Sequence, residues 1–403
     1  MKVLLVIADG LGDRPAKSLG GRTPLEAANT GNLDLLAREG MVGFIDPIRP
    51  GIIPGSDTSH LNYLGYNPEK YYTGRGPFEA MGTGLKLRGG DVAFRANFAT
   101  VDERGIVVDR RAGRIRERTA ELAAPLNMKI EDVDIMFREG TEHRAALVLR
   151  GPGINTEVTD NDPHSDNLPP REIKALDRSG EKTARILREF YSRSLDILRN
   201  HPVNRERREK GLREANAILF RGGGVVPVLP DFNEKYRIKG GYVAAVALVS
   251  GICRLAGLND FTPPGVTGST DTNVQAKIKA ALDALKQVDF VVVNIKGTDI
   301  AGHDGDAKAK KDFIEKIDDA LESVLPQRDD LVFCFTGDHS TPASVKEHTS
   351  DPVPILLRFP GCRRDGINHL DEITCRNGSL RLKGENLMDV LLSSANLSQK
   401  YGA

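Results

Sequence analysis

Three short runs of β-branched and aromatic residues limit the folds open to this 403-residue chain more than any other feature. The runs are residues 3–7, 288–295 and 331–335. Each is short enough to be a fully buried strand, as in parallel sheets that helices cover on both faces. Amphipathic patterns predict helices over residues 273–287, 307–325 and 387–397. This alternation of strands and helices predicts an α/β domain with a doubly wound sheet.

The middle of the chain has a different pattern, which predicts a second domain of the α+β class. Short strands separated by turns are expected at residues 93–99, 106–109 and 145–149. A long helix is expected over residues 181–199, followed by an end signal at His201 and Pro202. We therefore expect an inserted domain at residues 74–235, between the two parts of the first domain at 1–73 and 236–403.

The composition excludes several kinds of partner. The chain has 56 basic and 56 acidic residues, so its net charge of zero offers no electrostatic footprint for nucleic acid. Its four cysteines have no paired spacing that would indicate a zinc knuckle or a disulfide framework. No stretch approaches the roughly 20 apolar residues of a membrane span. The apolar N-terminal run also lacks a small-residue cleavage site, so we expect a cytoplasmic protein without membrane partners.

Two polar segments have simple interpretations. Residues 204–213 alternate arginine and lysine with glutamate, which predicts a solvated loop, with a local anion site as the alternative. Residues 221–224 read Arg-Gly-Gly-Gly and predict a turn, although such a segment can also approach an anion. Residues 151–170 are rich in proline, glycine and aspartate, which favours an exposed functional loop.

Metal-binding residue types follow each of the three apolar runs. Because the carboxyl ends of parallel strands share one edge of a sheet, these side chains can converge from distant parts of the chain. Any one of them alone would more simply be a turn residue, a helix cap or a structural histidine, but the set favours a metal centre. Mixed carboxylate and imidazole ligands suit Mn²⁺ or Zn²⁺ better than Ca²⁺, and two ions about 4 Å apart can clamp a transferring phosphoryl group. The candidate ligands are Asp9, Asp299, His303, Asp338, His339 and His348.

Ser56 is the candidate nucleophile. It lies in the small-residue turn 54–60, directly before a helical pattern, where backbone N–H groups favour anions. By itself Ser56 would be interpreted as an N-cap. Coordination by a metal ion can activate a serine hydroxyl, so the neighbouring ligand set favours a catalytic role.

Several motifs together resemble the archaeal cofactor-independent phosphoglycerate mutases of the alkaline phosphatase superfamily. The resemblance covers nearly the whole chain, in order. It rests on Asp-Gly-Leu-Gly-Asp-Arg-Pro at 9–15, Thr-Pro-Leu-Glu-Ala-Ala-Asn-Thr at 23–30, Gly-Ser-Asp-Thr-Ser-His-Leu at 55–61, Asp-Arg-Arg-Ala-Gly-Arg at 109–114, Asp-Asn-Asp-Pro-His at 160–164, His-Pro-Val-Asn-Arg-Glu-Arg-Arg at 201–208 and Gly-Asp-His-Ser-Thr-Pro at 337–342.

This resemblance implies an enzyme of glycolysis and gluconeogenesis that interconverts 3-phosphoglycerate and 2-phosphoglycerate. It implies an alkaline phosphatase-like domain with an inserted substrate-binding lid, and no need for 2,3-bisphosphoglycerate. It also implies two divalent ions, commonly Mn²⁺, with Mg²⁺, Co²⁺ and Zn²⁺ as alternatives. One ion would bind Asp9, Ser56, Asp338 and His339, and the other would bind Asp299, His303 and His348. Ser56 would take up the phosphoryl group and return it to the other glycerate hydroxyl.

The substrate contacts are carried over less directly, because the bacterial branch of the family has different motifs in these regions. Guanidinium groups bind phosphate and carboxylate in bidentate fashion. His164 is the candidate acid/base, with His143 and Arg144 as an alternative site for that role, and Lys239 is expected to stabilise charge at the leaving oxygen. The candidate substrate-binding residues are Arg110, Arg111, Arg114, Arg144 and Asp162.

Three other functions fit parts of the same pattern. A metal-dependent phosphomonoesterase or phosphodiesterase would keep the metals and Ser56 but transfer the phosphoryl group to water. A phosphotransferase of the same superfamily would use another acceptor. A non-catalytic metal-binding protein would tolerate the loss of Ser56. No feature of the sequence predicts the oligomeric state.

Overall fold

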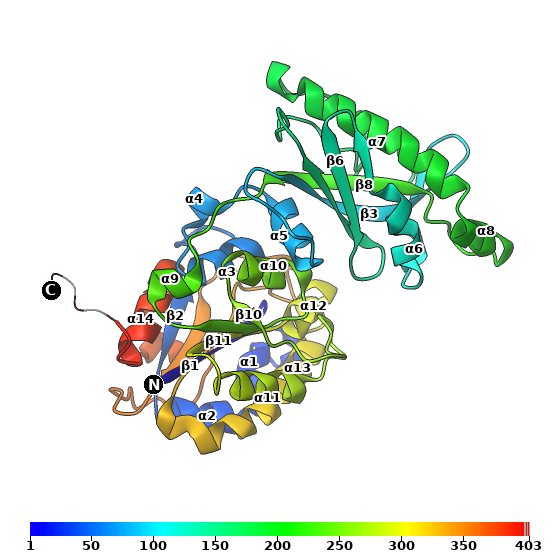
Figure 1. Cartoon of the computed structure of the whole chain (residues 1–403). Coiled ribbons are helices and arrows are strands. Elements are labelled where there is room, and N and C mark those ends of the chain that lie inside the picture. Colours follow the sequence, from blue (N-terminus) through cyan, green and yellow to red (C-terminus); the bar gives the residue numbers. More distant parts are fainter. Residues whose placement is uncertain (399, 401, 403) are drawn as a thin grey trace. The chain divides into compact units, whose positions relative to one another are not determined.

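The computed structural model describes residues 1–398, 400 and 402, and the chain divides into two compact units (Figure 1). The first unit comprises Met1–Tyr71 and Leu229–Ala403, and the second comprises Tyr72–Val228. Residues 229–235, which we expected in the inserted domain, belong to the first unit. There the ring of Phe232 stacks on Phe290 at 5.3 Å, and the Tyr66 hydroxyl donates a hydrogen bond to the carbonyl of Pro230.

The three predicted apolar strands form the centre of the first unit. Strand β1 (Lys2–Ala8) lies between β11 (Phe290–Ile295) and β12 (Leu331–Thr336), and both pairings are parallel. Nearly every residue of the three strands is buried. Ile7 of β1 pairs with Asn294 of β11 and with Thr336 of β12, so the three strands end at the same level.

The complete sheet has the strand order β10-β9-β11-β1-β12-β13-β2-β14. Strand β13 runs antiparallel to both of its neighbours, whereas the other described pairings are parallel. The outer strands are β2 (Met41–Asp46), β9 (Gly240–Val243), β10 (Asn259–Asp260), β13 (Val353–Arg358) and β14 (Leu380–Lys383).

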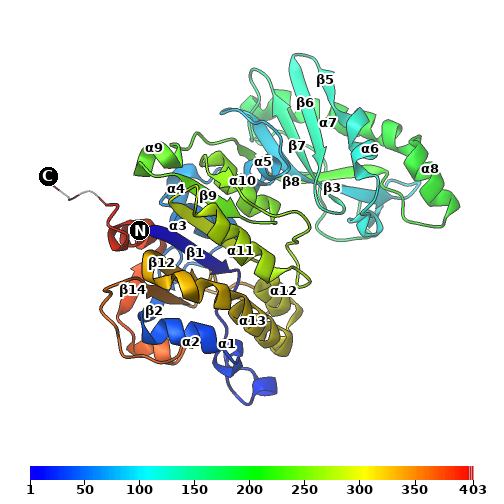
Figure 2. The same cartoon turned by 60° about the horizontal axis from the view of Figure 1, so that its bottom comes forward.

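Helices cover both faces of this sheet, as expected for a doubly wound α/β domain. Figures 1 and 2 show α2, α11 and α13 on one face and α3 and α10 on the other. Asn273 and Asp306 cap the N-termini of α11 and α13 by accepting hydrogen bonds from Ala276 and Ala309. The helices of this unit are α1 (Pro24–Ala27), α2 (Gly31–Arg38), α3 (Ser56–Tyr63), α4 (Pro68–Tyr71), α9 (Phe232–Tyr236), α10 (Ala247–Leu255), α11 (Val274–Ala284), α12 (Gly297–Asp304), α13 (Ala307–Leu321) and α14 (Leu387–Ser394).

The second unit is an antiparallel sheet packed against one long helix. The strand order is β8-β3-β7-β6-β5, and β4 pairs with the end of β3. Helix α7 (Glu181–Arg199) has the predicted bounds, and its Phe190 ring lies 6.2 Å from Phe137 of β6. The strands are β3 (Val92–Val101), β4 (Val107–Asp109), β5 (Met128–Ile130), β6 (Val133–Glu139), β7 (Arg144–Arg150) and β8 (Ala217–Val225), and the other helices are α5 (Arg75–Gly82), α6 (Thr119–Ala123) and α8 (Pro202–Glu209).

Side-chain alternation along β3 gives this sheet two different faces. Phe94 and Phe98 pack into the core under α7. Successive side chains of a strand point to opposite faces, so Arg95 and Asn97 lie on the other side of the sheet. A charged residue and an amide are therefore held on a largely buried strand.

Two of the expected loops are regular structure. Residues 204–213 were expected as a solvated loop, but helix α8 occupies most of them because Pro202 begins it and the His201 side chain caps it. Arg208 of this helix pairs with Glu214 at 2.8 Å, which does not support the alternative of an anion site. Residues 221–224 were expected as a turn, but they belong to β8. A Cβ atom on Gly224 would lie 2.6 Å from the Thr73 carbonyl, so glycine permits this close backbone approach.

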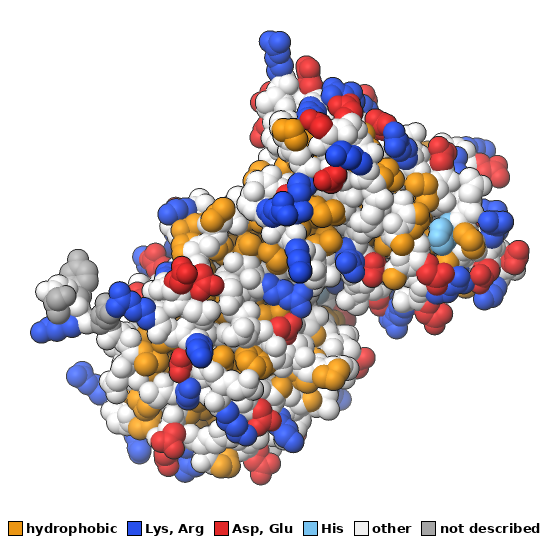
Figure 3. Space-filling model, in the orientation of Figure 1, with side chains coloured by type: hydrophobic (Ala, Val, Ile, Leu, Met, Phe, Trp, Pro, Cys, Tyr) orange, Lys and Arg blue, Asp and Glu red, His pale blue; other side chains and the backbone are white. Residues whose placement is uncertain are grey.

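The surface carries both signs of charge, as the equal numbers of basic and acidic residues predict. Positive and negative side chains are interspersed over the face shown in Figure 3. Within the described residues, no helix combines the length and the apolar character needed to cross a membrane.

Glu372 gives the first unit a measurable pH dependence. Its Oε1 accepts a hydrogen bond from the Asp13 N–H at 3.1 Å, and its Oε2 accepts one from the Thr23 hydroxyl at 2.6 Å. Exclusion of water raises the pKa of Glu372 to about 7. Between the ordinary pKa of a glutamate and this value, the folded state holds a proton that the unfolded state has released. Stability conferred by the protonated group is therefore lost as the pH rises through this window.

We expect Glu372→Gln to flatten this dependence, because glutamine does not ionise and, like a protonated carboxyl group, can accept a hydrogen bond from the Asp13 N–H and donate one to the Thr23 hydroxyl oxygen. Urea unfolding of the metal-free protein at about pH 5 and about pH 7.5 should show a loss on the order of 1 kcal/mol in the wild type and less in the variant. Glu385→Gln, at an exposed position, is the control. An unchanged pH dependence in Glu372→Gln would contradict the assignment.

Candidate functional site

The candidate site begins where the three central strands end. Asp9 directly follows β1, and its N–H donates to the carbonyl of Ile295, the last residue of β11, at 2.9 Å. Helix α12 begins two residues after β11 and presents Asp299 and His303 one turn apart. Asp338 and His339 follow β12. The common level of the three strand ends therefore brings together residues that are far apart in sequence.

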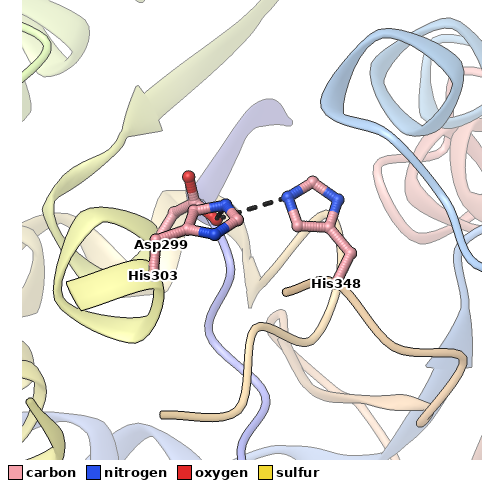
Figure 4. Close-up of side chains that lie close together, drawn as sticks. All are labelled: Asp299, His303 and His348. Carbon is pink, nitrogen blue, oxygen red and sulfur yellow. Dashed lines mark ion pairs between the residues drawn. The ribbon is translucent and has the colours of Figure 1, made fainter. Parts of the chain in front are cut away.

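The first cluster consists of Asp299, His303 and His348, whose ligand atoms all lie within 4.8 Å of one another. Figure 4 shows the three side chains pointing toward one another. The Nε2 atoms of His303 and His348 lie 3.4 and 3.6 Å from Asp299 Oδ1. His348 reaches the cluster from the loop that follows β12.

The second cluster consists of Asp9, Asp338 and His339, which are completely buried. His339 Nε2 lies 3.4 Å from Asp9 Oδ1 and 3.5 Å from Asp338 Oδ2. Asp338 Oδ2 has no hydrogen-bond partner among the described residues. A buried carboxylate oxygen without a partner is costly, and a bound cation would remove that cost.

The two clusters adjoin each other. Asp299 Oδ1 of the first lies 3.9 Å from His339 Nε2 of the second. The imidazole rings of His339 and His348 stack with their centroids 3.6 Å apart. Two cations bound at these clusters would therefore be close neighbours, as in two-metal phosphoryl-transfer centres.

Hydrogen bonds orient the imidazoles as metal ligands. His303 Nδ1 lies 2.9 Å from the Lys346 carbonyl, and His348 Nδ1 lies 2.9 Å from the Pro54 carbonyl. A carbonyl only accepts hydrogen bonds, so Nδ1 of each ring is the donor and the neutral ring leaves Nε2 as the ligand atom. Metal-binding histidines are usually fixed in this way by an outer partner. The carboxylate oxygens and the Nε2 atoms of the two clusters are therefore suitable ligand atoms for divalent metal ions.

Ser56 lies beside the second cluster. It is the first residue of α3, and its Oγ lies 3.2 Å from His339 Nε2. The alternative interpretation of Ser56 as an N-cap is wrong, because Gly55 occupies the cap position. The neighbouring His60 bonds locally: its Nδ1 donates to the Ser56 carbonyl at 2.7 Å. The Asn294 amide donates to Asp9 at 3.1 Å and lies 3.4 Å from His60 Nε2, which links helix α3 to the end of β11.

Lys296 is a site residue for which the sequence suggested no role. Its Nζ lies 2.8 Å from Asp9 Oδ1 and 2.6 Å from Asp299 Oδ2, so it bridges the two clusters. Burial opposes ionisation of both carboxyl groups, but Lys296 and the neighbouring histidines outweigh it and hold their pKa values below the usual range. The available signal was a lysine directly after an apolar strand and three residues before a candidate ligand.

Lys239, in contrast, lies at the wrong edge of the sheet for its expected role. Its N–H donates to Asp289 Oδ2 at 3.0 Å, and Asp289 directly precedes β11. Strands β9 and β11 are parallel, so Lys239 lies at their amino ends. The metal-binding residues lie at the carboxyl ends, and the expected contact of Lys239 with the reacting oxygen is therefore wrong.

The second unit contains a strongly basic pocket of about 190 Å³. Four of its lining arginines are candidates from the sequence, namely Arg110, Arg111, Arg114 and Arg144. The lining residues that the sequence did not indicate as substrate contacts are Arg95, Asn97, Glu142, His143 and Arg221. The missed signal for Arg95 and Asn97 is their i, i+2 spacing between the phenylalanines of β3.

Several buried atoms at this pocket have no hydrogen-bond partner within the described residues. They are Arg95 Nε, Asn97 Oδ1 and His143 Nδ1. Burial, with added repulsion from neighbouring arginines, lowers the pKa of Arg95 to about 10 and that of His143 to about 4. At neutral pH, therefore, the guanidinium is charged and the imidazole is neutral. Because a buried charge is costly unless it is paired, the pocket is suited to an anionic ligand.

Asp162 and His164 lie beside this pocket in different roles. Asp162 is buried and accepts two hydrogen bonds from Arg110, at 2.8 and 2.7 Å. It therefore orients the arginine, and the expectation that it binds substrate directly has no support in this geometry. His164 is 41% exposed, and its Nδ1 lies 3.2 Å from Nη1 of Arg221. Its other ring nitrogen lies 3.8 Å from Asp160.

Comparison with known proteins gives consistent matches. A family described as 2,3-bisphosphoglycerate-independent phosphoglycerate mutase matches residues 37–204. A protein of that name from Picrophilus torridus is 49% identical over 401 residues, which cover 100% of this chain and 99% of the relative. Another, from Methanothermobacter thermautotrophicus, is 48% identical over 411 residues, with 100% of both chains covered.

Solved structures are also similar along the whole chain. A protein from Pyrococcus horikoshii has a TM-score of 0.87 and 39% identity, with coverage of 100% of this chain and 99% of that one. A cofactor-independent phosphoglycerate mutase from Thermoplasma acidophilum has a TM-score of 0.75 and 42% identity, with coverage of 98% and 100%.

The first cluster predicts that His303→Ala will impair divalent-ion binding. The substitution removes an Nε2 ligand from a half-exposed position, so the fold should persist. Loss of an outer partner of a metal ligand typically costs about 10–100-fold in affinity, and loss of the ligand itself should cost at least as much. Calorimetric titration of the metal-stripped protein with Mn²⁺ measures the affinity for the ion. His369→Ala, which alters an exposed histidine that bonds Asp34, is the control, and equal affinities in the two variants would refute the cluster.

Proposed function

The chain belongs to the 2,3-bisphosphoglycerate-independent phosphoglycerate mutases, and from this we propose that Ser56 carries the phosphoryl group while 3-phosphoglycerate and 2-phosphoglycerate interconvert. One observation carries the assignment of the nucleophile. Ser56 Oγ lies 3.2 Å from His339 Nε2, at the edge of two adjoining clusters of metal-binding side chains.

In the first step, the phosphoryl group leaves the C3 oxygen of the substrate and bonds to Ser56 Oγ. The P–O bond to C3 breaks and the P–Oγ bond forms. The proton of the serine hydroxyl passes by way of an acid/base group to the C3 oxygen of glycerate. In the second step, the C2 hydroxyl oxygen attacks the phosphorus, the P–Oγ bond breaks, and the proton of the C2 hydroxyl passes by way of the acid/base group to Ser56 Oγ. The sequence of steps consumes no water and needs no 2,3-bisphosphoglycerate.

The residues present fit two divalent ions, one held by Asp9, Ser56, Asp338 and His339 and the other by Asp299, His303 and His348. Such ions would lower the pKa of the serine hydroxyl and neutralise phosphoryl charge. Mixed carboxylate and imidazole ligands favour Mn²⁺, with Mg²⁺, Co²⁺ and Zn²⁺ as alternatives.

We assign to Lys296 the charge-stabilising role that the sequence had suggested for Lys239. Its ammonium group already bridges Asp9 and Asp299, within reach of both clusters. An ammonium group held there provides positive charge for the equatorial oxygens of a transferring phosphoryl group. It also orients the two carboxylates toward their ligand positions.

The role proposed for the second unit is that of a substrate-binding lid, which holds the glycerate through its arginine pocket. A carboxylate pairs well with guanidinium groups, and the Nε donor of Arg95 has no partner within the described chain. His164 is the proposed acid/base for the glycerate hydroxyls. His143 suits that role less well, because its low pKa keeps it unprotonated at neutral pH. A small phosphorylated acid as partner and a cytoplasmic location are parts of the same proposal.

A hydrolase is the main alternative, because it would share the metal centre and the nucleophile. The two differ in the acceptor: a hydrolase transfers the phosphoryl group to water. Retention of glycerate by the pocket favours the mutase.

Ser56→Ala should abolish mutase activity, with a fall of at least about 10³-fold, because no oxygen remains to accept the phosphoryl group. The assay gives metal-stripped protein 3-phosphoglycerate, with and without Mn²⁺ and without 2,3-bisphosphoglycerate, and follows both 2-phosphoglycerate and free phosphate. Ion binding by Ser56→Ala should be weakened but retained. Ser59→Ala, which removes a buried hydroxyl of the same helix that has no described partner, is the matched control. Full activity of Ser56→Ala would refute the assignment of Ser56 as the nucleophile. If the wild-type protein yields only free phosphate, the enzyme is a phosphatase.

Arg144→Ala should lower kcat/KM about 10–100-fold, because a hydrogen bond to a charged group contributes about 1.5–3 kcal/mol. A rise in free phosphate should accompany this loss if the pocket retains the glycerate. Arg104→Ala removes an exposed arginine of the same unit outside the pocket and should be neutral. Equal kinetics for the two variants would exclude the pocket as the glycerate site.

A further inference from the structure

The Thr341 hydroxyl touches one candidate ligand from each metal-binding cluster. Its Oγ1 lies 2.8 Å from Asp299 Oδ1 and 2.9 Å from His339 Nδ1. Asp299 belongs to the first cluster and His339 to the second. Thr341 is completely buried, so bulk water does not compete for these two contacts.

The hydrogen positions follow from what each group can donate. A carboxylate only accepts, so the single hydrogen of the hydroxyl goes to Asp299 Oδ1. The hydroxyl then has only lone pairs to offer His339, and Nδ1 of that ring must carry the hydrogen. The neutral ring therefore presents Nε2 as its ligand atom. This is the atom that faces Asp9, Asp338 and Ser56.

Thr341 is itself fixed in position. The buried ammonium group of Lys310, on α13, donates to the carbonyls of Thr341 at 3.0 Å and Gly12 at 3.1 Å, and to Asp13 Oδ2 at 2.8 Å. The Thr341 N–H also donates to the Gly12 carbonyl at 3.1 Å. The loop after β12 is therefore tied to the loop after β1.

The opposite side of the hydroxyl is equally constrained. A Cβ atom on Gly10 would lie only 2.7 Å from Thr341 Oγ1, so glycine at this position leaves room for the hydroxyl. Gly10 also has a positive φ of 67°, which glycine adopts readily. The backbone on both sides thus holds Oγ1 between Asp299 and His339.

We propose that Thr341 is a positioning residue that couples the two ion sites, because one hydroxyl fixes both the ring orientation of His339 and the rotation of the Asp299 carboxylate. This inference rests on the two-ion centre of the proposed function. Removal of the hydroxyl should loosen one ligand of each site at the same time. By contrast, removal of a ligand such as His303 should act mainly on its own site.

Co²⁺ titration of the metal-stripped protein, followed by calorimetry and visible absorption, separates these patterns. Thr341→Val keeps the shape of the side chain, and both ions should bind about 10–100-fold more weakly to it. Thr341→Ser keeps the hydroxyl and should bind both ions with nearly wild-type affinity. If Thr341→Val binds both ions with wild-type affinity, or if it binds only one of them more weakly, the proposal that Thr341 couples the two sites is wrong.

A second measurement needs no substitution of Thr341. Long-range ¹H–¹⁵N correlation spectra of the metal-free wild-type protein, with ¹⁵N-labelled histidine, report which ring nitrogen of His339 carries the hydrogen. A hydrogen on Nδ1 is expected, and a ring protonated only on Nε2 overturns the proposal even if Thr341→Val does not fold.

Neither readout requires substrate, so the two proposals can fail separately. Wild-type protein that binds two ions but lacks mutase activity refutes the proposed function and leaves the role of Thr341 intact. Normal mutase activity with unaltered ion binding in Thr341→Val refutes the role of Thr341 alone. Wild-type protein that binds fewer than two ions refutes both.

Discussion

Three buried carboxylates that repel one another set the electrostatic constraint at the metal-binding end of the first unit. Asp299 belongs to the first of the two adjoining clusters and Asp9 and Asp338 to the second, and all three are almost completely shielded from water. Water does not screen their charges there, so nearby cations must compensate for them. Lys296 supplies one positive charge between Asp9 and Asp299. The remaining negative charge and the unpaired oxygen of Asp338 explain why divalent ions would stabilise this arrangement.

The two units have opposite electrostatic character. The clusters of the first unit consist of carboxylates and imidazoles, which suit cations. The pocket of the second unit is lined by guanidinium groups, which suit an anion. Phosphoryl oxygens suit bound cations, and a carboxylate suits arginine side chains. Electrostatic complementarity of this kind contributes to the specificity of each site for its ligand.

The sequence was most informative where a side chain and its structural context are adjacent in the chain. Asp9, Asp299 and Asp338 follow apolar strands, so the parallel sheet that those strands predict also predicts their convergence. Lys239 and Lys296 show the limit of this reasoning. Both border strands of the same sheet, and only the strand direction shows that Lys296 lies at the ligand end.

The basic pocket was harder to predict, because it depends on pairing between distant strands. Arg95 of β3 and Arg221 of β8 are partners in the sheet but are far apart in sequence. The hydrogen bonds from Arg110 to Asp162 likewise cannot be read from composition or spacing. Residues 204–213 were misjudged for another reason: their charge alternation also occurs on an exposed helix, and the proline and cap that begin α8 decided the outcome.

The pairing of β1 also has a consequence for biosynthesis. Val3 pairs with Phe290 on one side and with Val332 on the other, so the first strand emerges from the ribosome long before either partner exists. The second unit, by contrast, is a continuous segment whose strands pair among themselves. Domains generally fold as units during synthesis, so the inserted unit can fold while the sheet around it is still incomplete. The apolar β1 must meanwhile stay unpaired, and an unpaired apolar strand makes an incomplete chain prone to aggregation.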